Sequence, residues 1–201
     1  MTPHPPADAE RLLASILPAD TRDSVLGDLV EEYTESQVPG HGRMRANWWY
    51  RRHVAGFVWR ASRLWALALG SLLGARAVLD VTVQTTDHFQ MRARMTSYAV
   101  IGLFLALGAI VGRRTRRVLG AVAIAVVAGE LGCAMCLAVS VSMKTLAAFG
   151  LMQVRSFAGL DEAFDIPAIP MAVVGAACAL CGAGVGRMLA RSPTRRLPTG
   201  S

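Results

Sequence analysis

Four long apolar stretches constrain this chain more than any other feature. They cover residues 64–83, 95–112, 118–143 and 166–190, and about 18 apolar residues suffice for a helix to cross roughly 30 Å of hydrocarbon. The apolar residues come in runs and lack an amphipathic period, which indicates contact with lipid more than a water-soluble core. We therefore expect an all-α integral membrane protein, with a four-helix transmembrane bundle and a small N-terminal cytoplasmic helical head.

The composition agrees with a membrane setting. Of the 201 residues, 53% are hydrophobic and only 17% are charged, where a soluble domain carries about 25% charged residues. The net charge of +7 comes from arginines beside the ends of the apolar stretches. Positive charge at those places retains a loop in the cytoplasm, so we do not expect a nucleic-acid partner.

Arginine is unevenly distributed between the connecting segments, and this distribution predicts the topology. It crowds before the first stretch, in residues 113–117 and after the last stretch, whereas residues 144–165 end in Asp161, Glu162 and Asp165. The positive-inside rule then places both termini in the cytoplasm of a bacterial inner-membrane protein with four spans. The first residues lack a signal-peptide pattern, so the first span is expected to act as its own targeting signal.

The expected domains are the cytoplasmic head (residues 1–63), the transmembrane bundle (64–190) and a cytoplasmic tail (191–201). Within the head, the pattern predicts helices over 7–17 and from a cap at Asp20 to about residue 36, then a turn over 38–42. A third helix begins near Arg43 and runs without a break into the first span. The residues expected to close the head on this helix are Leu13, Ile16, Leu17, Leu26, Leu29 and Tyr33.

The third helix combines aromatic and basic side chains, which favour the headgroup layer of a membrane. It is predicted to form a lipid interface, either as an ordinary aromatic and basic belt or as a specific anionic-lipid site. The predicted interface residues are Trp48, Trp49, Arg51, Arg52, Trp59 and Arg60.

The second helix carries an acidic side opposite its apolar positions, and we call its residues Asp28, Glu31, Glu32 and Glu35 the acidic face. Two interpretations stay open. The acidic hairpin folds back and pairs with the basic helix, or the acidic face is held out to bind a partner.

Three segments of the head together resemble a known pattern. They are Leu12-Leu13-Ala14-Ser15-Ile16-Leu17-Pro18, then residues 22–33 with the core Leu26-Gly27-Asp28-Leu29-Val30-Glu31-Glu32-Tyr33, then Trp48-Trp49-Tyr50-Arg51-Arg52. This order resembles the permease prefix domain found ahead of macrolide-exporter-type ABC permeases, and it is similar to short helical domains associated with PadR-type regulators. The resemblance covers about residues 9–60.

The rest of the chain departs from those permeases, because its largest outer loop has about 20 residues and it lacks a phosphate loop. The resemblance therefore implies a regulatory or assembly role, not transport itself. The partners it implies are an ABC permease or a PadR-type regulator, besides membrane lipids. A homo-oligomer is also possible.

Two Cys-x-x-Cys pairs, Cys133 with Cys136 and Cys178 with Cys181, lie inside the spans. Their depths are too staggered for four sulfurs to meet one metal ion, so we interpret them as small packing residues. We expect no metal, no cofactor and no catalytic residue, because the chain carries no nucleophile–base pattern and no paired catalytic carboxylates. A non-enzymatic interaction protein is the leading function.

Glu130 lies near the middle of the third span, where an ionised carboxylate is costly. Arg76 in the first span is predicted to pair with it, at a depth that differs by roughly 6 Å. Asp80, one turn from Arg76 on the same helix, is the competing partner. The alternative function, a small transporter or channel subunit, would use Glu130.

Small residues recur four apart at Gly70 and Gly74, at Gly108 and Gly112, and at Gly182 and Gly186. Such pairs let two helices approach closely within a membrane. We expect them to pack helices within one chain more than to form a dimer.

Overall fold

A computed structural model describes residues 4–82, 89–151 and 168–191, and regular structure in these ranges is helical throughout. Four of the helices are long and apolar enough to cross a membrane. This confirms an all-α protein with four candidate spans, whereas the membrane orientation stays a prediction. The elements are α1 (Ala7–Ile16), α2 (Arg22–Glu32), the π-helix η1 (Tyr33–Gln37), α3 (Val38–Thr82), α4 (Phe89–Thr115), α5 (Val118–Ala148) and α7 (Ala168–Arg191).

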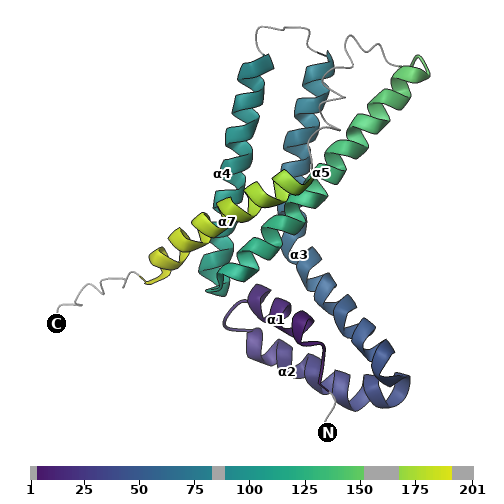
Figure 1. Cartoon of the computed structure of the whole chain (residues 1–201), viewed down its shortest axis with the longest axis vertical. Helices are drawn as coiled ribbons and strands as arrows, with labels where there is room; N and C mark the ends of the chain where they lie inside the picture. The colour runs from purple at the N-terminus through teal and green to yellow at the C-terminus, as the bar shows by residue number, and fades with distance from the viewer. Residues whose placement is uncertain (1–3, 83–88, 152–167, 192–201) are drawn as a thin grey trace, which may run out of the picture.

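The head forms a separate unit at one end of the bundle, as Figure 1 shows, and α1 is its element nearest the bundle. Its core surrounds Leu13, Tyr33 and Tyr50, whose side chains are completely buried. Leu17 and Leu29 belong to this core and Leu26 packs against it, as expected. The prediction for Ile16 is wrong, because Ile16 packs into the core of the bundle.

The expected turn over residues 38–42 is confined to Gly42. Residues 38–41 are helical, and Gly42, with φ 78° and ψ 160°, breaks the helical geometry, so that two helices meet there at a kink. A side chain is strained at positive φ, so glycine is the residue that can make this break. From Arg43 the helix continues without a break to Thr82, which confirms the prediction of a third helix that begins near Arg43 and runs into the first candidate span.

The start of the second helix also differs from the prediction. Thr21, not Asp20, occupies the N-cap position of α2, and no side chain caps it. At its other end the predicted α-helix widens into the π-helix η1. Hydrophobic spacing does not distinguish a π-turn from an α-turn over so few residues.

Glycines let the long helices approach one another closely. Gly108 and Gly112 face Ala179 and Ala183, and on the other helix Gly182 faces the backbone of Leu105. Gly70 and Gly74 likewise face α5 at Met135 and Val139. The small residues therefore pack helices within one chain, as predicted.

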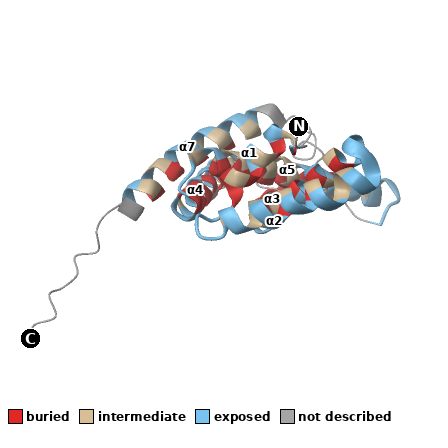
Figure 2. Cartoon of the chain, turned by 90° about the horizontal axis from the view of Figure 1, so that it is seen from below, coloured by how far each residue is buried: buried red, intermediate tan, exposed pale blue. Residues whose placement is uncertain are grey.

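Burial is concentrated along the middle of the bundle, and the outward faces of its helices are exposed (Figure 2). These outward faces are apolar. Examples of their exposed side chains are Leu64, Leu67, Leu105, Ile110, Val173, Leu180 and Met188. Exposed apolar side chains along the candidate spans are what contact with lipid requires.

Candidate head–bundle interface

The head contacts the bundle through α1 and through Arg22 at the start of α2, and we call this contact the head–bundle interface. It consists of Ser15, Leu17 and Arg22 from the head, and Thr115 and Gly120 from the bundle. At its centre the backbone carbonyl of Ser15 lies directly on Gly120. A side chain at position 120 would collide with that carbonyl, so only glycine permits this approach.

Arg22 joins two helix ends at this interface. Its guanidinium donates hydrogen bonds to the carbonyl of Thr115 at 2.8 Å and to the carbonyl of Leu17 at 3.3 Å. Leu17 is the C-cap of α1 and Thr115 is the last residue of α4. Carbonyls at a helix C-terminus lack helical partners and carry partial negative charge, so Arg22 stabilises both ends at once.

The connection between α4 and α5 presents the Thr115 carbonyl to Arg22. Arg116 adopts a left-handed φ of 56°, and this reverses the chain within two residues. The Thr115 hydroxyl is buried and accepts a hydrogen bond from the Arg117 amide at 3.2 Å. The Thr115 carbonyl therefore forms part of the surface on which the head docks.

Two tyrosines fix α2 and η1 to α3. The Tyr33 hydroxyl donates to Asn47 Oδ1 at 2.6 Å, and the Tyr33 and Tyr50 rings meet edge to face with centroids 6.0 Å apart. Burial, together with the nearby Glu10 carboxylate, raises the pKa of Tyr50 to about 12. The neutral phenol is therefore the form that the head core accommodates.

The acidic face points away from this core. Its four side chains are all exposed, and none of them forms an ion pair within the described residues. At about 100° per residue they occupy one side of the helix, roughly 100° wide. The other interpretation, pairing of the acidic hairpin with the basic helix, is represented among the described residues by one ion pair, between Arg51 and Asp8 of α1.

The predicted lipid-interface residues lie along α3 but do not share one environment. Trp48 is 65% exposed and carries Arg52 over its ring at 5.4 Å. Trp49 is half-buried, packs against the head core and stacks on His53. Trp59 and Arg60 are exposed on the stretch just before the first span.

A groove opens beside this stretch, between α1, α3 and α5. Its volume is about 550 Å³, and the Arg51–Asp8 pair lies along its wall. We call it the junction groove, and its lining residues are Asp8, Ala9, Leu12, Arg51, Val54, Ala55, Val58, Trp59, Val127 and Leu131.

The structure does not bring Arg76 and Glu130 together. Because Gly70 faces Met135 and Gly74 faces Val139, Arg76 lies about eleven residues beyond the level of Glu130, or roughly 16 Å at helical rise. No ion pair or hydrogen bond joins the two within the described residues. The sequence estimate of depth was too small, because the register between two helices depends on side-chain packing.

Arg76 lines a second groove of about 340 Å³ between α3, α4 and α7, together with Thr96 and Ser97. Glu130 is half-buried on α5 and lines neither groove. The side chain of Asp80 lies outside the described residues. Its pairing with Arg76 and a transport role of Glu130 stay predictions.

The four cysteines are free thiols. Cys136 is buried, Cys133 and Cys178 are half-buried and Cys181 is exposed. Within the described residues no three histidine, cysteine, aspartate or glutamate side chains gather where they could hold a metal ion.

Comparison with known proteins gives no relative: no family model, no curated protein and no solved structure matches this chain.

Sequence reasoning missed Arg22, Thr115 and Gly120. Arg22 stands at the start of a polar helix, where an arginine is ordinarily a solvated side chain. Nothing in the local pattern says that the carbonyl it reaches lies 93 residues away. Only the helix ends at Leu17 and Thr115, neither of which is followed in the sequence by the glycine that commonly ends a helix, could have suggested a shared cation.

Proposed function

We propose that this chain is a non-enzymatic membrane adaptor whose head presents the acidic face to a protein partner with a basic surface. One observation carries the proposal. The head is held against the bundle at one side, by α1 and Arg22, while the acidic face stays exposed and forms no ion pair with any residue that the structure describes.

The arrangement supports binding more than self-stabilisation. The four carboxylates repel one another on a single side of a helix, and none of them forms an ion pair with α3 among the described residues. A partner with lysine or arginine side chains would relieve the repulsion and steer the encounter. The head is anchored, so the face keeps a fixed orientation relative to the membrane and binding loses less entropy.

The resemblance of the head to the permease prefix domain suggests the class of partner, a permease or a PadR-type regulator. In this proposal the head lies in the cytoplasm, as the arginine distribution predicts. The four spans serve as the anchor, and Glu130 has no role in a flux.

Site-specific photo-crosslinking in native membranes tests the proposal. Benzoylphenylalanine replaces Gly27, which is exposed beside the acidic face with open space around its Cα. Met44 on α3, 88% exposed, is the control position. We expect one discrete protein adduct from position 27, attached through a lysine- or arginine-rich peptide, and none from position 44.

The charge variants complete the test. Neutralising the acidic face (Asp28→Asn, Glu31→Gln, Glu32→Gln and Glu35→Gln) should abolish the adduct. The matched control, Asp20→Asn with Asp23→Asn, removes exposed acids outside the face and should leave it. An adduct that survives neutralisation of the face contradicts the proposal.

A further inference from the structure

The junction groove has two chemically distinct parts. Toward the head, Asp8 and Arg51 form an ion pair at 3.1 Å, and their side chains are 70% and 61% exposed. Away from the head, the lining is aliphatic, with Val58, Val127 and Leu131. The groove therefore joins a paired positive and negative charge to an apolar channel.

The positions of the two parts along the bundle correspond to the two layers of a membrane surface, the headgroups and the hydrocarbon. Leu131 precedes Gly132, which faces Leu69 within the first span, so the apolar part reaches hydrocarbon depth. Trp59, also in the lining, is 53% exposed just before that span, where an aromatic side chain favours the headgroup layer. The Arg51–Asp8 pair lies two turns of α3 further toward the head, which is about 12 Å.

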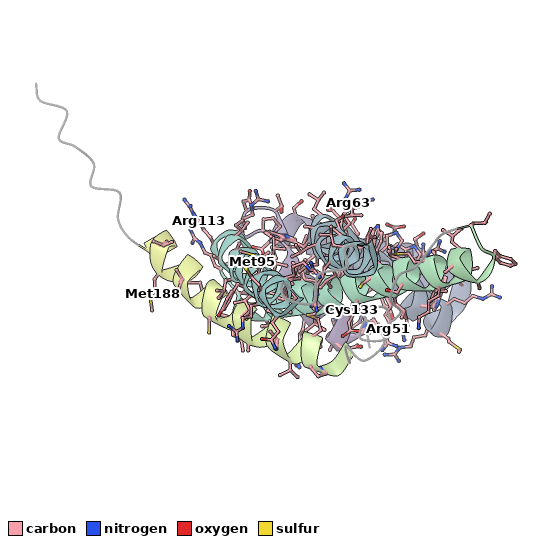
Figure 3. The ribbon with its side chains drawn as sticks, turned by 90° about the horizontal axis from the view of Figure 1, so that it is seen from above. Arg51, Arg63, Met95, Arg113, Cys133 and Met188 are labelled. Atoms are coloured by element: carbon pink, nitrogen blue, oxygen red, sulfur yellow. The ribbon has the colours of Figure 1, made fainter. Side chains whose placement is uncertain are left out.

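Figure 3 looks along the bundle from the end opposite the head. In that view Arg51 and Cys133 lie on the same side of the molecule, whereas Arg63 projects from the opposite side. Arg51, in the charged part of the groove, therefore lies on the side of the molecule away from Arg63.

We propose that the junction groove binds one phospholipid with a phosphoethanolamine headgroup, drawn from the leaflet that faces the head. Its phosphate contacts the Arg51 guanidinium and its ammonium contacts the Asp8 carboxylate. One acyl chain lies in the apolar part beside Val58 and Val127. The volume of about 550 Å³ lies within the range of small-molecule sites, about 300–1,000 Å³.

Charge complementarity selects this headgroup over an anionic one. A headgroup with phosphate alone would satisfy Arg51 but would bring negative charge toward Asp8. A zwitterionic headgroup satisfies both members of the pair, and both are exposed enough to exchange one partner for another. The site therefore differs from an anionic-lipid site built on arginine alone.

Native mass spectrometry of the detergent-purified full chain tests the proposal, with dioleoyl phosphatidylethanolamine and dioleoyl phosphatidylglycerol as probes. We expect the wild-type chain to retain the ethanolamine lipid about fivefold better, as for one exposed charge contact. Equal retention, or better retention of the glycerol lipid, would overturn the headgroup assignment. This comparison needs no variant and is independent of folding defects.

Two pairs of variants locate the site. Asp8→Asn should remove the preference between the two lipids, whereas the control Asp20→Asn should keep it. Ala55→Trp should fill the groove and abolish retention of both lipids, whereas the control Ala99→Trp, on an exposed part of α4, should not. Circular dichroism of each variant checks that the helices remain.

Lipid retention that Ala55→Trp does not change would place the lipid elsewhere and overturn the proposal. A groove that holds no lipid, and whose residues become shielded from solvent only as the protein concentration rises, would also overturn the proposal. That result would indicate that the groove is a contact between two copies of the chain.

Discussion

At the contact between α4 and α7, glycines bring two backbones together, and the atoms nearest to these glycines belong to Leu105, Ala109, Ala179 and Ala183. At the head–bundle interface one glycine does the same, but the contact also needs a cation that satisfies two helix ends. In lipid, helices associate by close packing, because apolar side chains gain nothing by leaving lipid for one another. Outside the lipid, water competes with protein donors for hydrogen bonds to every carbonyl. A fixed orientation of the head therefore requires specific hydrogen bonds.

The comparison predicts that a methyl group added between α4 and α7 lowers the stability of the protein more than any other substitution considered below. In Gly182→Ala the new Cβ would lie against the Leu105 carbonyl, and overpacking of this kind costs about 1–3 kcal/mol or more. The measurement is thermal unfolding in detergent. Gly184→Ala, on the same helix with open space at its Cα, is the matched control and should unfold near the wild-type temperature.

The same substitution at the interface should release the head without opening the bundle. Gly120→Ala places a methyl group on the Ser15 carbonyl, again at a cost of about 1–3 kcal/mol. Limited proteolysis should then cleave the α1–α2 connection faster, while the unfolding temperature of the bundle changes little. The control is Gly102→Ala, which meets no neighbour, and cleavage as slow in Gly120→Ala as in the control would show that α1 is not docked there.

Removing the cation should have a smaller effect at the same place. Arg22→Gln loses the bonds to Leu17 and Thr115, which we expect to cost about 1–2 kcal/mol for a charged hydrogen bond at helix ends. Hydrogen exchange should rise in residues 12–18 and 112–117 together. If only one of these segments responds, or if Arg11→Gln, which alters an exposed arginine of α1, gives the same rise, Arg22 does not join the two ends.

Substitutions of the two tyrosines of the head core should change the stability least, and the two should differ from each other. Tyr33→Phe loses the hydrogen bond to Asn47 and should destabilise by about 0.5–1.5 kcal/mol. Tyr50→Phe should be nearly neutral at pH 7, because the Tyr50 hydroxyl makes no hydrogen bond within the described residues.

The pKa of Tyr50 gives that residue a distinct pH signature. Its pKa is about 12 in the fold and 10.0 for the unperturbed side chain, so its stabilising contribution is complete below about pH 10. The contribution is lost as pH rises from 10 to 12, since the unfolded chain releases the proton first. Tyr50→Phe should flatten the loss of stability in this window, and an unchanged alkaline profile would contradict the burial of the phenol.

The four candidate spans and the long third helix could be predicted, because runs of apolar residues and helical periods are local signals. The packing of Gly108, Gly112, Gly182 and Gly186 was also accessible, since small residues four apart serve close helix contact whatever their partner. The placement of Ile16, the depth of Glu130 relative to Arg76 and the reach of Arg22 were not accessible. Each depends on how two distant helices align, and that register follows from packing across the whole molecule.

A distance measurement between the head and the bundle tests the account most directly. Spin labels at Glu31 and Leu119, both exposed, are placed in a background without the four native cysteines and measured by double electron–electron resonance in lipid nanodiscs. The docked head predicts one narrow distance distribution, unchanged by high salt and broadened by Gly120→Ala. A broad distribution in the otherwise native chain would mean that the head swings freely, and would contradict the docked arrangement.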